Sequence, residues 1–400
     1  MHNDPITITI VGAGASGCFC AAQLHEALPG ADIRIFEAGS KPLAKLALTG
    51  GGRCNISNDF STVRSLAEVY PRGSSLMKRA LAEFSTEKTL EWFKKIGVGG
   101  FVTEEGGRIF PASQDAMEVV RALKNALCGV EIICNHKLTV LPDSDVVVLT
   151  TGGGPGMDIL KGLPVETLPP VPSLFTFNVS DKPSGGRSEV TALMGLSVDA
   201  TLSILGSGLR SEGPLLITDW GFSGPAALRL SAYAARYLAE RSYRCPLNVR
   251  WASSDEASLR TEIHALKSSN PNKLLKSVHP EGIPSRLWEY LLDRTGVRDG
   301  RTWSELGPKW EGRLVQTLLC DSYHISGKTR FREEFVTCGG VALSSVNLKT
   351  MECKERPGLY FAGEILDVDA VTGGFNLQAA WSTAHMAAKT IISKYGTQIR

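Results

Sequence analysis

The chain contains no run of about 18 consecutive apolar residues, the length that a membrane-spanning helix requires, so no spanning helix is expected. It also lacks a strong excess of either charge. The 43 Lys and Arg stand against 41 Asp and Glu, and the net charge of +2 argues against a nucleic-acid partner. The nine cysteines follow no framework, which is typical of reduced thiols in a cytoplasm. The N-terminus, Met1–Pro5, carries no signal-peptide pattern. These absences predict a cytoplasmic protein that binds neither membrane nor nucleic acid.

Several catalytic patterns are missing as well. The sequence has no Ser-His-Asp set, no H-E-x-x-H and no C-x-x-C pair, so hydrolase, zinc and dithiol chemistry lack support. No histidine joins the acidic residues Glu364, Asp367 and Asp369, and no metal site is predicted. Polar or surface roles account for His324 and His385 more simply than acid catalysis does. The catalytic residues therefore stay unknown at this stage.

What the sequence does contain is a glycine-rich turn after a short β-branched strand, Ile6–Val11. Gly12, Gly14 and Gly17 follow in the spacing G-x-G-x-x-G, and a helix continues from there. The first glycine permits a tight turn, the second lets backbone approach a pyrophosphate, and the third lets helix pack on strand. The helix start offers free N–H groups and the positive end of the helix dipole.

A second strand over residues 32–36 delivers Glu37, twenty residues after Gly17. An acid at this place accepts hydrogen bonds from ribose hydroxyls and repels a 2′-phosphate. Strand, helix, strand and acid in this order predict a dinucleotide-binding unit. The alternative is a glycine-rich turn in an unrelated α/β unit.

Two further glycine-rich segments favour FAD over NAD as the dinucleotide. Residues 50–52 are three consecutive glycines, which let backbone pass close to a flat ligand, and Arg53 would place positive charge beside it. Near the other end, a strand over 359–362 leads to Glu364, a carboxylate suited to a polyol chain. A helix that opens at 373–376 would direct its N–H groups at a reduced flavin. An NAD enzyme needs no such second cradle.

Blocks of sequence in a fixed order run through almost the whole chain. They are Thr49–Asn55 with Ser57-Asn58, Gly107–Ser113, Gly221–Ala226, Gly339–Val341, Lys349–Lys354 and Pro357–Asp369. In these blocks the chain resembles the BaiN/YhiN-type FAD-dependent oxidoreductases. The motifs and the resemblance together predict FAD-binding roles for Gly12, Gly14, Ala15, Ser16, Gly17, Glu37, Ala38, Lys45, Gly51, Gly52, Arg53, Cys54, Asn55, Gly363, Glu364, Gly374, Phe375, Asn376 and Leu377.

The predicted fold class is α/β, with a Rossmann-type FAD-binding domain interrupted by an inserted β-rich domain and a helical subdomain. Four hundred residues exceed what one core usually holds, which favours several domains. The predicted divisions are 1–170 and 327–400 for the FAD-binding domain, 171–252 for the β-rich insertion and 253–326 for the helical subdomain. Helices are expected over 74–96, 115–127 and 225–241, and a capping box from Ser253 to Glu256 is expected to start another. The 138–165 segment is shorter than in similar family members, which would alter the substrate entrance.

Two other residues have competing interpretations. Cys54 lies in the glycine loop but has no partner at dithiol spacing, so packing is favoured over redox chemistry. Arg108 suits either a structural ion pair or the binding of an anionic substrate or cofactor.

The predicted function is an FAD-dependent oxidoreductase that transfers hydride between the flavin and a small organic substrate or NAD(P)H. Gly206-Ser207-Gly208 lacks a third glycine, so NAD(P)H would visit the flavin without a Rossmann unit of its own. One alternative is a flavin-dependent RNA-modifying enzyme, which would need a concentrated basic groove. Another is a flavin-binding protein without turnover. The substrate, the direction of electron flow and the oligomeric state stay open.

Overall fold

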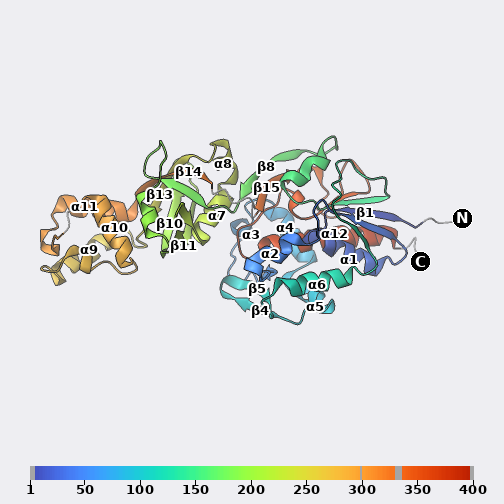
Figure 1. Cartoon of the computed structure of the whole chain (residues 1–400), viewed down its shortest axis with the longest axis horizontal. Helices are drawn as coiled ribbons and strands as arrows, with labels where there is room; N and C mark the ends of the chain where they lie inside the picture. The colour runs from blue at the N-terminus through green and yellow to red at the C-terminus, as the bar shows by residue number, and fades with distance from the viewer. Residues whose placement is uncertain (1–4, 298–299, 329–335, 397–400) are drawn as a thin grey trace. The chain divides into compact units, whose positions relative to one another are not determined.

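The computed structural model describes residues 5–297, 300–328 and 336–396. The chain divides into two compact units (Figure 1). The first unit is Met1–Val171 with Val336–Arg400, and the second unit is Pro172–Phe335. The predicted return of the chain near 335–346 begins at a residue outside the described ranges and continues in the first unit.

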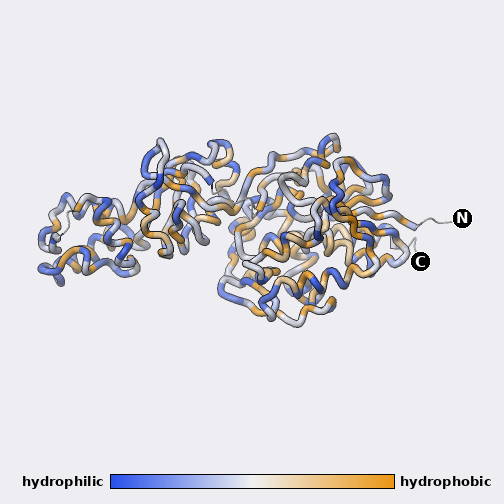
Figure 2. Tube along the Cα trace, viewed as in Figure 1, coloured by the Kyte–Doolittle hydropathy of each residue, from blue (hydrophilic) through white to orange (hydrophobic). Residues whose placement is uncertain are grey.

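The first unit is built on a five-stranded sheet with the order β16-β7-β1-β2-β6, in which every neighbouring pair is parallel. The strands are β1 Thr7–Val11, β2 Asp32–Phe36, β6 Glu131–Ile133, β7 Val146–Leu149 and β16 Leu359–Phe361. All four residues of β7 are buried, as expected for a parallel sheet covered on both faces. Figure 2 shows apolar residues gathered along β1 and more polar residues on the outer helices.

Helices pack around this sheet, and the first and the last of them begin directly after glycine-rich segments. They are α1 Ala15–Ala27, α2 Ala44–Gly52, α3 Leu66–Val69, α4 Ser74–Glu83, α5 Thr86–Lys95, α6 Ala116–Ala126 and α12 Phe375–Tyr395. The single helix expected over 74–96 is two helices, because Phe84 leaves the helical conformation and Ser85 caps α5 with its hydroxyl. The N-terminal α1 packs against the C-terminal α12, where Ser16 Oγ donates to the Ala380 carbonyl oxygen at 3.1 Å.

The structure also contains two smaller sheets and seven 3₁₀ helices among the described residues. The strands β3 Ser57–Asn58, β5 Arg108–Pro111 and β4 Phe101–Glu104 form an antiparallel sheet, and β8 Thr167–Ser173 pairs with β15 Val336–Val341. The 3₁₀ helices are η1 Glu105–Gly107, η2 Gly154–Leu160, η3 Glu189–Leu193, η4 Leu275–Ser277, η5 Trp303–Glu305, η6 Leu343–Ser345 and η7 Gly363–Ile365. Within the described residues, no helix combines the length and the apolar character needed to cross a membrane.

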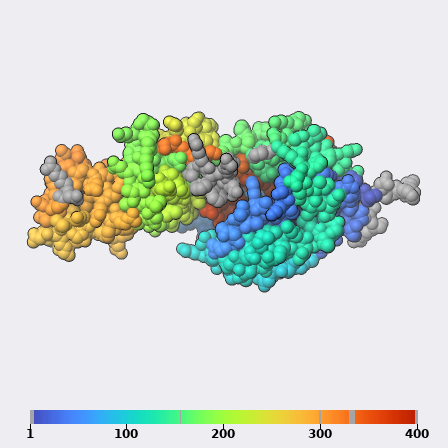
Figure 3. All heavy atoms as spheres, in the orientation of Figure 1, coloured from blue at the N-terminus to red at the C-terminus, as the bar shows by residue number. Residues whose placement is uncertain are grey.

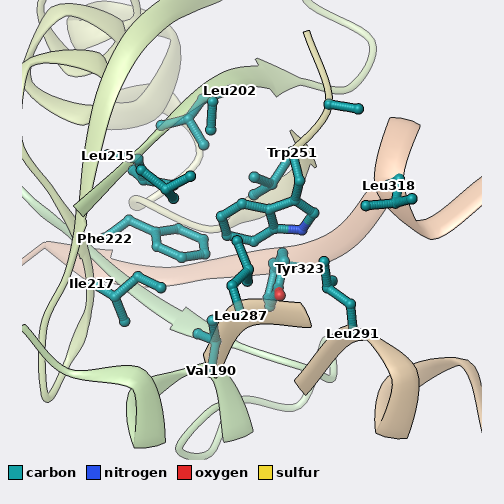
Figure 4. Close-up of a cluster of buried hydrophobic side chains, with 14 of the residues drawn as sticks. Val190, Leu202, Leu215, Ile217, Phe222, Trp251, Leu287, Leu291, Leu318 and Tyr323 are labelled. Carbon is teal, nitrogen blue, oxygen red and sulfur yellow. The ribbon is translucent and has the colours of Figure 1, made fainter. Parts of the chain in front are cut away.

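The second unit contains a closed barrel with the strand order β10-β11-β12-β9-β14-β13. Its strands are β9 Phe177–Ser180, β10 Ser197–Ile204, β11 Arg210–Ile217, β12 Gly221–Ser223, β13 Cys245–Arg250 and β14 Asp321–Lys328. Phe222, Trp251 and Tyr323 meet in its core, and residues of the following helices, Leu287 and Leu291, reach the same cluster (Figure 4). The barrel and the helices therefore share one core. The predicted α/β class with a β-rich insertion and a helical part is confirmed.

The helices of the second unit are α7 Pro225–Tyr233, α8 Ala235–Glu240, α9 Glu256–Ser269, α10 Ser285–Thr295 and α11 Pro308–Leu319. The expected capping box at Ser253 is wrong, since Asp255 caps α9 by accepting a hydrogen bond from the Ser258 N–H at 2.8 Å. The helix expected over 225–241 is interrupted at Ala234. The strand β14 follows these helices and closes the barrel, although the predicted divisions place its first six residues in the helical subdomain.

Candidate cofactor site

The glycine turn after β1 has two tightly packed glycines and one open one. A Cβ added to Gly17 would lie 1.9 Å from the Gly12 carbonyl oxygen, and one added to Gly12 would lie 2.6 Å from the Thr150 carbonyl oxygen. A Cβ on Gly14 would have no atom of the described residues within 4 Å. Gly14 is also the N-cap of α1 and supplies no side-chain cap, which leaves the first N–H groups of the helix available for an anion.

Glu37 stands at the end of β2 and reaches back to this turn. Its Oε2 accepts from the Ala13 N–H at 2.8 Å, and its Oε1 accepts from the Gly39 N–H at 2.6 Å. A carboxylate has about four acceptor positions, so these two bonds orient the group and leave capacity for a diol. Ala38, the next predicted residue, is exposed beside it.

Glu364 lies in η7, where the C-terminal motif meets the N-terminal turn. Its Oε1 accepts from the Thr337 N–H at 2.7 Å, while Oε2 lies 3.9 Å from Lys45 Nζ. A Cβ added to Gly363 would lie 2.8 Å from Ser16 Cβ, so the two motifs, far apart in sequence, touch. The chain therefore folds back onto its own start at this edge of the sheet.

A residue that the sequence reasoning did not single out also lies here. Thr151 follows β7, and its Oγ1 is buried without a hydrogen-bond partner among the described residues. The neighbouring Thr150 uses its hydroxyl within the protein, donating to the carbonyl oxygens of Val11 at 3.0 Å and Gly12 at 2.9 Å. A buried hydroxyl without a partner costs free energy, which a bound ligand would recover. The strand end Thr150–Gly153 was the available signal.

The glycine loop at the C-terminal end of α2 combines open and packed positions. Helical geometry stops before Thr49, and Gly51 and Gly52 take φ values of 69° and 86° with no described atom within 4 Å of an added Cβ. Cys54 is completely buried, and burial raises the pKa of its thiol to about 12. This supports packing over redox chemistry for Cys54. Figure 3 shows the blue surface around α2 beside the teal surface around α6, and the two helices pack together.

Arg53 lies at the C-terminal end of this loop and points to the small antiparallel sheet. Its Nη1 donates to Glu104 Oε1 at 2.8 Å and to Gln114 Oε1 at 3.1 Å. The guanidinium carbon lies 4.2 Å from the centre of the Phe110 ring. Its charge is therefore partly used within the protein.

The start of α12 is organised by side chains predicted to touch the cofactor. With its amide oriented to satisfy the surrounding backbone, Asn55 donates to the Ser57 and Ile109 carbonyl oxygens and accepts from the Gly374 N–H at 3.0 Å. Asn376 accepts from the Ala370 N–H at 2.9 Å and donates to the Ala370 carbonyl oxygen at 3.0 Å. The two amides therefore hold the backbone around the start of α12 in place.

The other two predicted residues of this helix start lie in its first turn. Phe375 is buried, and its carbonyl oxygen accepts from Tyr70 OH at 2.9 Å, while Leu377 is half-buried. The segment just before α12 is also held by an ion pair between Arg72 and the fully buried carboxylate of Asp369. Because these partners are 297 positions apart, no local pattern in the sequence indicates the pair.

The chemical groups of these residues suit the phosphate and hydroxyl groups of FAD. The open face at Gly14, the partnerless Thr151 hydroxyl and the carboxylates of Glu37 and Glu364 lie at the ends of strands of one sheet. Dinucleotides bind at this edge of open α/β sheets.

Two family models match the chain. The HI0933-like protein Rossmann domain matches residues 6–154, and the HI0933-like protein barrel and H2TH domain matches residues 171–336. The chain belongs to the HI0933-like family. This membership confirms the resemblance to BaiN/YhiN-type flavoproteins and the predicted enzyme class, an FAD-dependent oxidoreductase.

Three curated relatives of this HI0933-like protein align over nearly their whole length. The ribosomal RNA dihydrouridine synthase of Haemophilus influenzae is 29% identical over 414 residues, covering 96% of this chain and 97% of the relative. The enzyme of the same name from Escherichia coli K12 is 28% identical, covering 96% and 97%. The 3-dehydro-bile acid delta(4,6)-reductase of Clostridium scindens is also 28% identical, covering 96% and 98%.

Proposed function

We propose that this HI0933-like protein is an FAD-dependent reductase that delivers hydride to one carbon of an unsaturated carbon–carbon bond of a small organic substrate, while a proton from solvent adds to the other carbon. The observation that carries the proposal is the open-faced Gly14 turn, set between packed glycines and beside the buried, partnerless Thr151 hydroxyl. The names of the three relatives support the reaction class, because a dihydrouridine synthase and a delta(4,6)-reductase both describe reduction of unsaturated bonds.

The residues of the site have distinct tasks in this proposal. Bound FAD would supply hydride transfer, and the chain supplies binding, orientation and electrostatics. Glu37 accepts hydrogen bonds from ribose hydroxyls, and the N-terminus of α1 faces the pyrophosphate. Glu364 binds the polyol chain with the oxygen that Thr337 leaves unused. Gly51 and Gly52 let backbone lie close to the flat ring because no side chain intervenes.

NAD(P)H is the proposed electron donor, and it reaches the site transiently. Another short glycine pattern, Gly206-Ser207-Gly208, connects β10 to β11 in the barrel. It is a hairpin turn and does not lead into a helix, so it offers no N-terminus for a second pyrophosphate.

An anaerobic absorption titration of the purified protein with NADH and NADPH tests this proposal. We expect the flavin spectrum to bleach with one nucleotide and to return when an α,β-unsaturated ketone is added. A preparation that carries no flavin and takes up none from added FAD would overturn the proposal that FAD is the cofactor. Bound flavin that neither nucleotide reduces would overturn the proposed donor.

A second candidate substrate is uridine in RNA, favoured by the names of two relatives that align over 96% of the chain. These names oppose the expectation that the protein has no nucleic-acid partner. The two candidates differ in their product. The reduced enzyme is incubated with unmodified ribosomal RNA, and dihydrouridine is measured by mass spectrometry of the nucleosides. Formation of dihydrouridine at enzyme-dependent rates would replace the small-molecule proposal with this one.

A further inference from the structure

We infer that Arg53, Glu104 and Arg108 form an anion-binding subsite beside the glycine loop, and that it holds an oxyanion of the substrate. The assignment to substrate rests on the proposed function, whereas anion binding itself does not. The chemistry that fits is a carboxylate of a small acid or a phosphate of a nucleic-acid backbone.

Three elements bring the cluster together. Arg53 directly follows Gly51 and Gly52, the open positions of the loop. Glu104 ends β4 and Arg108 begins β5, and the antiparallel register pairs these two residues directly. The cluster therefore adjoins the backbone that is proposed to lie against the flavin ring.

One carboxylate faces two guanidinium groups. Arg53 Nη1 donates to Glu104 Oε1 at 2.8 Å, and Arg108 Nη2 lies 3.7 Å from Glu104 Oε2. Arg108 Nε donates to the Glu105 carbonyl oxygen at 3.0 Å. The three side chains together carry one excess positive charge, and they are 40%, 31% and 42% exposed in the order Arg53, Glu104, Arg108.

Both guanidinium groups keep donors in reserve. Each group has five N–H bonds. Within the described part of the chain, no hydrogen bond uses Nε or Nη2 of Arg53, or Nη1 of Arg108. The planar fork of N–H groups matches carboxylate and phosphate oxygens, which makes these donors suited to an anion.

Neighbouring acids do not occupy the free donors of the two arginines. The carboxylate of Asp59 accepts from the Ser61 N–H at 2.8 Å and from Ser61 Oγ at 2.7 Å. Among the described residues, Glu105 contacts the cluster through its carbonyl oxygen and forms no ion pair with either arginine. The donors that Arg53 and Arg108 leave unused within the described residues therefore stay available to an anion.

The cluster is also held in place more firmly than an ordinary surface ion pair. The Arg53 guanidinium stacks on Phe110, and Gln114 directs its amide oxygen to Arg53 from a left-handed backbone conformation with φ of 55°. Such a conformation is strained for a residue with a side chain, and strain of this kind concentrates at binding sites. Exposed ion pairs without this support contribute little.

The test uses the full-length protein, with and without FAD, and isothermal titration calorimetry with inorganic phosphate and with acetate at constant ionic strength. We expect Arg108→Gln to weaken phosphate binding about tenfold, the size of one charge-assisted contact. Glu104→Gln is expected to strengthen it, because it removes the competing carboxylate. Arg121→Gln is the matched control, since Arg121 pairs with Asp115 at an exposed site outside the cluster.

The subsite would be overturned by equal phosphate affinity in the three variants Glu104→Gln, Arg108→Gln and Arg121→Gln. If Arg108→Gln fails to fold, the Glu104→Gln variant still decides the test. Opposite shifts in the two cluster variants, seen with and without FAD, would support it even if no nucleotide reduces the flavin. Failure of the reductase proposal is thus separate from failure of the subsite. Tighter binding of a uridine oligonucleotide than of acetate, lost in Arg108→Gln, would assign the oxyanion to RNA phosphate, and the reverse order would assign it to a small acid.

Discussion

Gly14 and Gly17 belong to one turn but have opposite surroundings. Gly17 packs against the Gly12 carbonyl oxygen and the Thr150 hydroxyl, whereas Gly14 faces open space. The backbone of Gly14 has φ of −80°, which any residue adopts. The conformational freedom of glycine is therefore not what Gly14 contributes. Its contribution is the absence of a side chain.

This difference separates stability from cofactor binding. Gly17→Ala is expected to destabilise the protein by about 1–3 kcal/mol, because its Cβ would overlap backbone. Gly14→Ala is expected to change stability by less than about 0.5 kcal/mol and to weaken FAD binding tenfold or more. Urea unfolding and quenching of FAD fluorescence measure the two effects. Wild-type FAD affinity in Gly14→Ala would contradict the placement of the pyrophosphate.

His385 on α12 predicts a pH dependence of stability. Its ring stacks on Phe84, and its Nδ1 lies 2.7 Å from Gln23 Oε1. Burial, and then the charges of Lys389 and Lys88, lower its pKa from 6.5 to about 4. The unfolded chain therefore takes up the proton first as the pH falls.

The free energy of unfolding that depends on His385 is fully present above pH 6.5 and decreases as the pH falls from 6.5 to about 4. In His385→Gln this part of the dependence should disappear. Urea midpoints measured at intervals between pH 7.5 and pH 4 compare the two proteins. Parallel pH profiles for wild type and variant would show that another group is responsible.

At the scale of elements, the second unit is joined by a buried ion pair between α10 and the barrel. Arg294 Nε donates to Asp321 Oδ1 at 2.5 Å, and Arg294 Nη1 donates to Asp181 Oδ1 at 2.9 Å. Asp321 Oδ2 accepts from Trp251 Nε1 at 3.0 Å and from Tyr323 OH at 2.5 Å. Asp321 thus connects β14 to a helix that precedes it in sequence.

Removing Asp321 takes away one of the two carboxylate partners of Arg294. It also leaves the buried Trp251 Nε1 and Tyr323 hydroxyl without their acceptor. Asp321→Ala is expected to cost about 3–5 kcal/mol. Glu256→Ala is the control, because Glu256 and Arg260 form an exposed pair that is worth about 1 kcal/mol or less. Urea unfolding followed by tryptophan fluorescence gives both values. A cost for Asp321→Ala no larger than that of the control would show that the pair is not what joins helix and barrel.

At the scale of the whole molecule, every residue proposed to bind FAD lies in the first unit. The second unit has its own core of barrel and helix residues. Each unit is therefore stabilised by its own hydrophobic core, and a ligand that binds the first unit need not stabilise the second.

Calorimetry should then show two thermal transitions, of which FAD raises only one. A ligand at one hundred times its Kd stabilises the state that binds it by about 2.7 kcal/mol, which is enough to separate the transitions. The protein without FAD is the reference. A single transition that FAD shifts as a whole would indicate that the two units unfold together.

Much of the first unit could be predicted from the sequence because its signals are local. The strand expected over 32–36 is β2 with the same bounds, and the Rossmann turn follows from the glycine spacing together with the strands, helix and acid around it. The β-rich insertion could also be predicted, from strand-like segments between residues 174 and 251 and from the family resemblance. These features depend on residues within about one turn or one strand of each other, where propensity and periodicity act directly.

The tertiary structure alone decided how distant segments combine. Barrel closure by β14, the Arg72–Asp369 pair and the Arg53–Glu104 pair each join residues that are far apart in the sequence and whose neighbours in the sequence do not indicate the partner. Asn376 also could not be assigned from the sequence alone. Its amide forms hydrogen bonds with the Ala370 backbone and therefore does not face an open ligand site. The sequence by itself determined the dinucleotide fold and its glycine turns, because backbone conformation is a local property. Which polar groups remain available to a ligand was decided by packing, because only the folded chain shows which donors and acceptors already have partners.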